Sequence, residues 1–110
     1  MIEDTLARIE QRLATLDTLD ADKRQELTEL FRSLKGEVTG LSRTATEPAE
    51  SITRFAAISA HEATRRERNP ALHRLSLEGL AASVRGFEVS HPALVRHVNA
   101  ICMALSDIGI

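Results

Sequence analysis

The sequence has few of the residues that usually identify a function. It contains one cysteine, no tryptophan and no tyrosine, and aromatic residues make up 3% of its 110 positions. The single cysteine, Cys102, cannot form an internal disulfide, which favours a reducing compartment. Without tryptophan or tyrosine, the core must be filled by leucine, isoleucine and alanine. These side chains favour helices over sheets.

The chain also lacks a strong net charge and a long apolar run. Its formal net charge of -2 argues against a general affinity for nucleic acid or for anionic membranes. No segment approaches the roughly 20 apolar residues that span a membrane, and Glu3 and Asp4 argue against a secretory signal. We therefore expect a cytoplasmic protein, with neither a membrane nor a nucleic acid as partner. The length is typical of a single domain, 1–110, with one core.

Helical periodicity dominates the first 41 residues. Large apolar residues at intervals of four, three, four and three predict a helix over 2–16. These residues are Ile2, Leu6, Ile9, Leu13 and Leu16. A second helix is predicted over 21–41, with Asp20 as its N-cap. Because the connection between them is short, we expect residues 1–41 to form an antiparallel helical hairpin.

The middle of the chain is less regular. Thr46 and Pro48 predict the start of a third helix, which we extend to Arg68. Its apolar face is thin and consists of Ile52, Phe55, Ala56, Ser59 and Ala63. We therefore interpret residues 44–69 as an inserted helix or arm. The pair Asn69-Pro70 ends this helix.

The last 41 residues predict a second hairpin, 70–110. A fourth helix is expected from Pro70 to about Glu88, centred on Leu80, with Gly79 allowing close approach of a neighbour. A final helix follows, with Ser90 as its N-cap and Pro92 in its first turn. Val89 and Leu94 are expected to form a hydrophobic staple, and Gly109 is expected to end the helix.

The final helix is the most apolar part of the chain. Its main stripe consists of Leu94, Val98, Ile101, Leu105 and Ile108, and Val95, Cys102, Met103 and several alanines widen it. A helix with so wide an apolar surface belongs in the middle of a bundle or at a subunit interface. With no strand pattern anywhere, we predict an all-α fold of four to five helices, in which two antiparallel hairpins form a bundle that oligomerisation completes.

The C-terminal third also resembles a known family. The run from Gly79 to Ile110 is similar to the C-terminal part of a family of short bacterial proteins described as a domain of unknown function. There a Phe-Glu-x-Ser-His-Pro junction precedes an apolar helix that ends near Gly-Ile. The matching residues here are Phe87, Glu88, Ser90, His91, Pro92, Gly109 and Ile110.

The resemblance extends to the acidic, leucine-rich hairpin of residues 1–41. Many members of the family are shorter and lack the stretch from about Thr44 to Pro70, which implies that this stretch is an insertion. The resemblance implies a helical fold and a bacterial cytoplasmic setting. It implies no activity, cofactor or catalytic residue.

Glu88 and His91 form the one pattern that is typical of a metal site. Glu-x-x-His places a carboxylate and an imidazole on one face of a helix, as in ferritin-like di-metal proteins. Those sites need two such motifs and two further glutamates, whereas this chain has one motif, at a helix start. We interpret Glu88 and His91 as residues of the helix junction, and keep a metal site shared between subunits as the alternative hypothesis.

The remaining candidates favour structural roles. His61, His73 and His97 lack the spacing of metal ligands, and Cys102 is best interpreted as a small buried hydrophobe. The arginines that could meet an acidic partner or nucleic acid are Arg54, Arg65, Arg66 and Arg68. Glu62 and Glu67 dilute this charge, which favours a solvated face.

Taken together, the sequence predicts a non-enzymatic oligomerisation or protein-interaction module without a cofactor. A homodimer is the favoured assembly, and another protein is a possible partner. The predicted third helix, with its thin face, is available to either.

Overall fold

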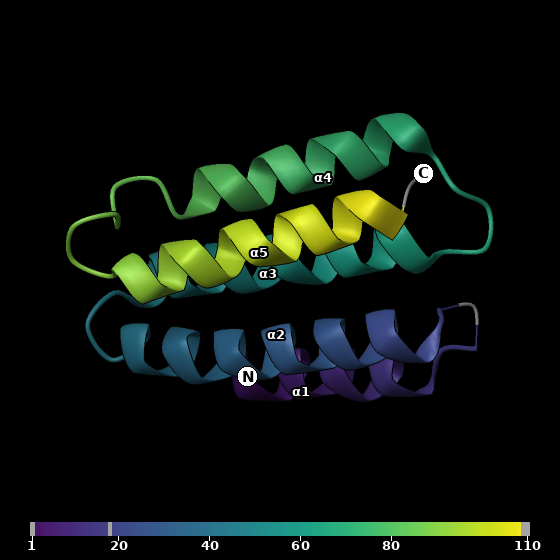
Figure 1. The fold of residues 1–110 in the computed structure, drawn as a ribbon. Coiled ribbons are helices and arrows are strands. Elements are labelled where there is room, and N and C mark those ends of the chain that lie inside the picture. Colours follow the sequence, from purple (N-terminus) through teal and green to yellow (C-terminus); the bar gives the residue numbers. More distant parts are fainter. Residues whose placement is uncertain (1, 18, 109–110) are drawn as a thin grey trace.

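The structure is a computed structural model, in which residues 2–17 and 19–108 are described. These residues form five helices that alternate in direction: α1 (Ile2–Thr15), α2 (Ala21–Leu41), α3 (Thr46–Thr64), α4 (Pro70–Ser83) and α5 (Pro92–Ile108). In the view of Figure 1, α4, α5 and α2 lie one below the other, with α3 behind α5 and α1 partly behind α2. The predicted all-α bundle is confirmed.

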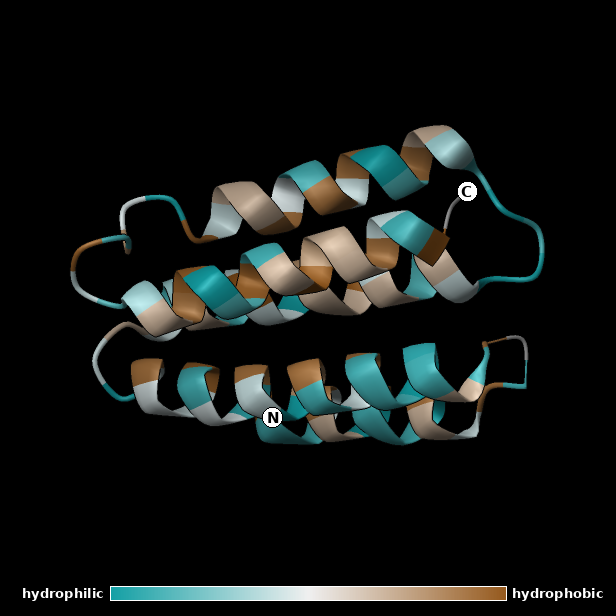
Figure 2. Cartoon of the chain, in the orientation of Figure 1, coloured by the Kyte–Doolittle hydropathy of each residue, from teal (hydrophilic) through white to brown (hydrophobic). Residues whose placement is uncertain are grey.

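The first hairpin is built as predicted. Asp20 caps α2, because its carboxylate accepts a hydrogen bond of 2.8 Å from the backbone N–H of Lys23. The apolar residues of α2 lie along its inner edge, facing α5 in Figure 2. Of these, Leu27, Phe31, Leu34 and Val38 are fully buried.

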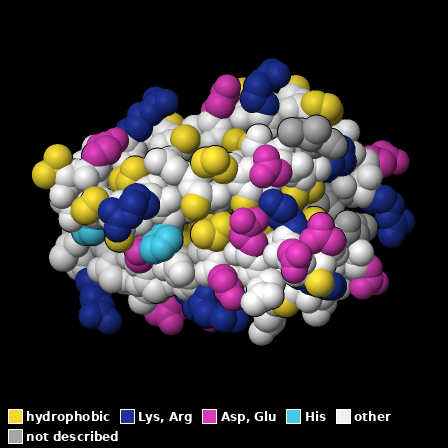
Figure 3. Space-filling model, viewed as in Figure 1, with side chains coloured by type: hydrophobic (Ala, Val, Ile, Leu, Met, Phe, Trp, Pro, Cys, Tyr) yellow, Lys and Arg dark blue, Asp and Glu magenta, His cyan; other side chains and the backbone are white. Residues whose placement is uncertain are grey.

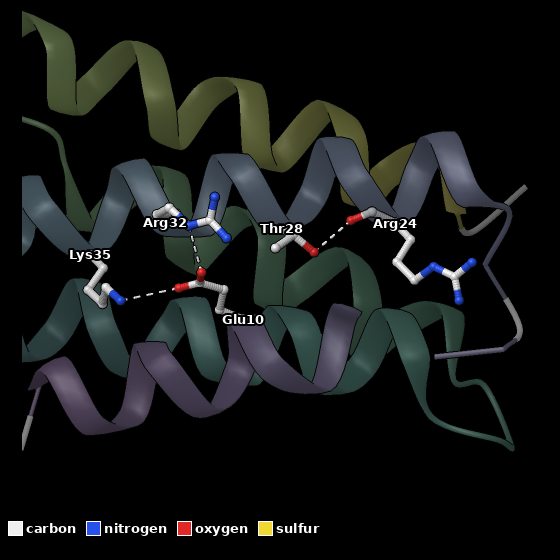
Figure 4. A network of polar contacts seen from close by, with 5 residues as sticks. All are labelled: Glu10, Arg24, Thr28, Arg32 and Lys35. Carbon is white, nitrogen blue, oxygen red and sulfur yellow. Dashed lines mark hydrogen bonds and ion pairs between the residues drawn. The ribbon is translucent and has the colours of Figure 1, made fainter. Parts of the chain in front are cut away.

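An ion pair network centred on the half-buried Glu10 joins α1 to α2. Glu10 of α1 accepts hydrogen bonds from Arg32 Nε at 2.7 Å and from Lys35 Nζ at 3.3 Å, both on α2 (Figure 4). Burial is the largest single influence on the Glu10 carboxylate and raises its pKa, but the hydrogen bonds and charges of Arg32 and Lys35 together outweigh it. The net result is a pKa below the ordinary value of 4.5.

The substitution Glu10→Gln therefore has a pH-dependent cost. At about pH 7 we expect the free energy of unfolding to fall by roughly 0.5 to 1 kcal/mol. This is at the low end for hydrogen bonds between charged groups, because Arg32 is largely exposed. A lowered carboxyl pKa stabilises the fold fully above its unfolded value, so this contribution disappears as the pH falls through the folded-state pKa. Urea unfolding of both proteins at about pH 7 and about pH 3 measures the difference.

Glu78, which is exposed on α4, supplies the control for this experiment. Glu78→Gln should change stability less at both pH values. A Glu10→Gln loss that persists unchanged in acid would show that the charge of Glu10 is not its source.

The third helix is part of the bundle, which corrects its interpretation as an arm. α3 packs against all four other helices, and it buries eight residues. Four of them are alanines: Ala49, Ala56, Ala60 and Ala63. Small side chains produce a face that looks thin in the sequence, yet they allow neighbouring helices to approach closely.

The predicted ends of α3 and α4 were too late. α3 ends at Thr64 rather than Arg68, because Arg65 is already extended, with φ -68° and ψ 154°. α4 ends at Ser83 rather than Glu88, and the turn that follows contains Gly86 at φ +97°, a conformation that favours glycine. Asn69 caps α4 through a 3.0 Å hydrogen bond from the N–H of Leu72.

The final helix is also placed differently. α5 contacts α2, α3 and α4 but is not enclosed, since Met103 is 71% exposed on its outer side. It begins at Pro92, so His91 immediately precedes it. The prediction of Ser90 as the N-cap is therefore wrong. The staple is also wrong, because Val89 is 95% exposed. The predicted stop at Gly109 lies outside the described residues.

The two helices of the predicted second hairpin, α4 and α5, each pack mainly on another helix. α4 and α5 are antiparallel neighbours, but α4 packs most extensively on α3, and α5 on α2. α3 approaches α4 closely at Gly79, because a Cβ atom built there would overlap the ring of Phe55. The hydroxyl of Ser59 donates a buried 3.0 Å hydrogen bond to the carbonyl of Ser76 nearby.

Alanine substitutions at two glycines should therefore change the stability of the protein in opposite directions. Gly36 is exposed on α2, and an added Cβ meets no atom within 4 Å, so Gly36→Ala should stabilise the protein by up to about 1 kcal/mol. Gly79→Ala gains the same helix propensity but displaces Phe55, with a net loss of about 1 kcal/mol. Thermal melts of both variants check the contrast; a stabilised Gly79→Ala would mean that Phe55 moves aside freely.

Candidate functional site

Glu88 and His91 lie in the turn between α4 and α5 and interact with their own turn. Glu88 Oε1 accepts a 2.8 Å hydrogen bond from the backbone N–H of Gly86. The His91 ring packs edge-on against Phe87, with ring centroids 5.5 Å apart, and its Nδ1 lies 2.9 Å from the hydroxyl of Ser90. A metal ion would have to replace these contacts.

The other histidines are distributed over different helices. His61 is exposed on α3, and His73 is buried on α4. His97 of α5 lies close to Glu37 of α2, with Nδ1 2.6 Å from the carboxylate, although the two are not aligned as a hydrogen bond. Over residues 2–17 and 19–108, no three His, Cys, Asp or Glu side chains are grouped so that they could hold a metal ion.

Cys102 has the surroundings of a structural thiol. It is half-buried on α5, and its Sγ lies 3.8 Å from the carbonyl oxygen of Leu77 on α4. Burial raises the pKa of the thiol above its ordinary value. Because the thiolate is the nucleophilic form, this environment disfavours reactivity.

Most of the arginines considered as a basic cluster are engaged within the chain. Arg65 pairs with Glu62 at 3.0 Å, and Arg54 pairs with Glu50 at 3.6 Å. Arg68 bridges two helix ends: its guanidinium donates to the carbonyl of Ala63 on α3 at 2.8 Å and to that of Ile108 on α5 at 2.7 Å.

Arg68 thus has a structural role that the sequence reading missed. Free carbonyl groups at helix C-termini attract cations, and a basic residue shortly after a helix end is the sequence signal for such a cap. The face seen in Figure 3 carries basic and acidic side chains interspersed, in keeping with a mixed surface.

Four large apolar side chains remain partly exposed on the outward side of the α3–α4 pair. Phe55 and Ile58 of α3 are 36% and 48% exposed, and Leu72 and Leu75 of α4 are 43% and 54% exposed. We call these four residues the α3–α4 face. Within each helix the two residues are three positions apart and therefore lie on one side.

Two contacts fix how α3 and α4 lie against each other at this face. The hydrogen bond from Ser59 to Ser76 sets the register of the antiparallel pair, and the ring of Phe55 lies over Gly79. Leu75 precedes Gly79 by one turn, so the two lie on the same side of α4. The signal for this face in the sequence was Ile58, a large apolar residue outside the inward stripe of α3.

A groove of about 700 Å³ adjoins this face on the side of α1. It exists because α1 has 14 residues and α2 has 21, so α1 leaves the last turns of α2 uncovered, as Figure 1 shows. Its lining includes Ile2, Ala57, Ile58 and several hydroxyl groups. The Thr53 hydroxyl donates to Ala49 O at 2.8 Å within α3, and the Thr46 hydroxyl donates to Ser42 O at 3.1 Å.

The resemblance to a family of short bacterial proteins stays a prediction after comparison with known proteins. None of the helices in the described part of the chain has the length and apolar character needed to cross a membrane. Comparison of the chain with models of protein families, with curated proteins and with solved structures found no match.

Proposed function

We propose that this chain is a non-enzymatic helical interaction module of the cytoplasm, and that its partner is a second copy of itself. The observation that supports this proposal is the α3–α4 face, where four large apolar side chains are between 36% and 54% exposed on adjacent helices. Large apolar side chains that gather on the surface are typical of a protein interface.

The surroundings of the reactive side chains favour a role without catalysis. Burial raises the pKa of the Cys102 thiol, which disfavours the nucleophilic thiolate, and Glu88 and His91 interact within their own turn. The arginine contacts likewise speak against nucleic acid as the partner, because Arg54, Arg65 and Arg68 interact with acidic side chains or helix carbonyls of the same chain.

The mass of the purified protein in solution tests the proposal. Light scattering at tens of micromolar should give twice the chain mass of 12.1 kDa. Because apolar contacts dominate the proposed interface, the dimer should persist when the salt concentration is raised. A mass of one chain across this concentration range would refute self-association.

The alternative function is metal binding at a site that two subunits assemble from Glu88 and His91. Oligomerisation would supply the second Glu-x-x-His motif that one chain lacks. Elemental analysis of protein purified without an affinity tag distinguishes the two functions. Stoichiometric iron, zinc or manganese that is lost in Glu88→Gln would favour the alternative, and its absence would favour the interaction module.

A further inference from the structure

We infer that the chain binds an organic phosphate monoester in a hollow at one end of the bundle. The hollow has a volume of about 590 Å³ and lies where α1, α3 and α5 end, at the right of the bundle in Figure 1. Four arginines line it: Arg12, Arg65, Arg66 and Arg68. The site belongs to a single copy of the chain, so this inference goes beyond the proposed self-association and does not depend on it.

The four arginines come together only in the folded chain. Arg12 lies in the last turn of α1, whereas the other three lie in the link between α3 and α4, far along the sequence. No acidic side chain is among the described residues that line the hollow. A guanidinium group stays charged throughout the physiological pH range. In a chain with a net charge of -2, this hollow is a local concentration of positive charge that attracts anions.

Most of this positive charge is not compensated. Within the described part of the chain, one carboxylate pairs with the cluster: Glu62 lies 3.0 Å from Arg65. Arg68 donates to backbone carbonyls, which carry no formal charge. Arg12 and Arg66 are exposed, and their side chains have no partner among the described residues. Because each guanidinium group has five N–H donors, many donors remain available to a ligand.

The contacts of Arg68 reduce the main obstacle to an anion at this end of the bundle. Helix C-termini carry a partial negative charge, and three helices end here. The Arg68 guanidinium donates to the carbonyl of Ala63 at 2.8 Å and to that of Ile108 at 2.7 Å, so it covers part of this charge on α3 and α5. These hydrogen bonds also hold Arg68 in place before a ligand arrives, which lowers the entropic cost of binding.

The number of guanidinium groups favours a phosphate monoester over a carboxylate. A phosphate monoester carries a charge of about -1.5 to -2 near pH 7 and presents three acceptor oxygens. Guanidinium groups bind such oxygens through paired, parallel hydrogen bonds. A carboxylate has a single charge and two oxygens, so it would leave more of the four arginines without an acceptor.

The rest of the lining favours an organic ligand over inorganic phosphate. Leu16, Leu19 and Ile108 are partly buried against the core and also line the hollow. The volume of about 590 Å³ is within the range of roughly 300 to 1,000 Å³ that is typical of small-molecule sites. We therefore expect a ligand whose phosphate group contacts the arginines while an apolar group contacts the two leucines and Ile108.

Isothermal titration calorimetry with phenyl phosphate tests the class of ligand. Phenyl phosphate should bind at least about tenfold more tightly than inorganic phosphate, which lacks the apolar group, and than benzoate, which lacks the second charge. Its binding should weaken when the salt concentration is raised. If phenyl phosphate does not bind at millimolar concentration, or if inorganic phosphate binds as tightly, the inferred ligand is wrong.

Two substitutions test the location of the site. Arg12→Ala and Arg66→Ala should each weaken the binding of phenyl phosphate about tenfold. Both side chains are exposed, so the fold should survive, which circular dichroism and a thermal melt check. Arg66→Lys keeps the charge but loses the paired donors, and should restore only part of the affinity.

Arg96→Ala is the matched control. Arg96 is exposed near the start of α5, at the other end of the bundle, and its substitution should leave the affinity for phenyl phosphate unchanged. Equal weakening by Arg96→Ala and Arg66→Ala would show a general attraction of anions to arginines and would overturn the site. Unchanged affinity in both Arg12→Ala and Arg66→Ala would overturn it as well.

Vesicles distinguish the two sources of a phosphate monoester, a soluble molecule and the headgroup of phosphatidic acid. Because the chain is negatively charged as a whole, we expect it to stay in the supernatant when it is sedimented with phosphatidylcholine vesicles that contain phosphatidic acid. Sedimentation with these vesicles that is lost in Arg66→Ala would support the same site with a lipid as its ligand.

The mass of the chain in solution separates this inference from the proposed function. A monomer that binds phenyl phosphate through Arg12 and Arg66 supports the site and refutes self-association. A dimer that does not bind phenyl phosphate refutes the site and leaves self-association standing.

Discussion

Leu105→Ala should lower the free energy of unfolding by about 2 to 5 kcal/mol. Leu105 lies on α5 with no exposed surface, on the same face as the buried Leu94, Val98 and Ile101. This face packs against α2, the principal neighbour of α5. Removing the three outer carbon atoms of the side chain leaves a cavity that the rigid helix pair cannot close.

The measurement for Leu105→Ala is chemical unfolding in urea, supported by a thermal melt. A loss in this range corresponds to a fall in Tm of roughly 10 to 20 °C for a domain of this size. Met103→Ala is the control on the same helix, because Met103 is 71% exposed and should change stability by less than about 0.5 kcal/mol. Similar losses for both variants would mean that α5 is rotated relative to the structure described here.

Phe31→Ala should have the other large effect, a loss of about 3 to 5 kcal/mol. Phe31 of α2 is fully buried, whereas Phe55 is 36% exposed and Phe87 is half-buried. Because the chain has three phenylalanines and no tryptophan or tyrosine, the core around Phe31 consists of smaller side chains that cannot reach across the space of a missing ring.

A conservative substitution separates the volume of Phe31 from its shape. Phe31→Leu retains most of the apolar volume and should cost less than about 1.5 kcal/mol. Urea unfolding of both variants provides the comparison. If Phe31→Ala costs no more than Phe31→Leu, the ring does not fill the centre of the core.

The candidate site shows where reading the sequence failed. Phe55 was predicted to face inward, because it has helical spacing with Ile52 and Ser59, yet its ring projects over Gly79 and remains partly exposed. Periodicity locates the side of a helix that is apolar, but it cannot say which neighbour covers the edge of that side. The α3–α4 face became visible only when the two helices were placed beside each other.

The helix ends show a similar division. Asp20 was predicted as the N-cap of α2, because a capping side chain acts on backbone groups two or three residues away, and Pro70 was predicted as the start of α4. The end of α3 was not legible, because Arg65 to Arg68 are residues with good helix propensity. There the chain leaves the helix, and the Arg68 guanidinium reaches the carbonyl of Ile108, 40 positions along the sequence.

The helical class, the antiparallel hairpin of α1 and α2, and most of the core residues could be predicted from the sequence. These features follow from local spacing, capping and side-chain size, which act within a few residues. Only the tertiary structure decided that α3, with its small alanines, lies at the centre of the bundle, while the more apolar α5 lies toward the surface. The physical reason is that helices pack by how closely their side chains let them approach, and that distance depends on residues far apart in the chain.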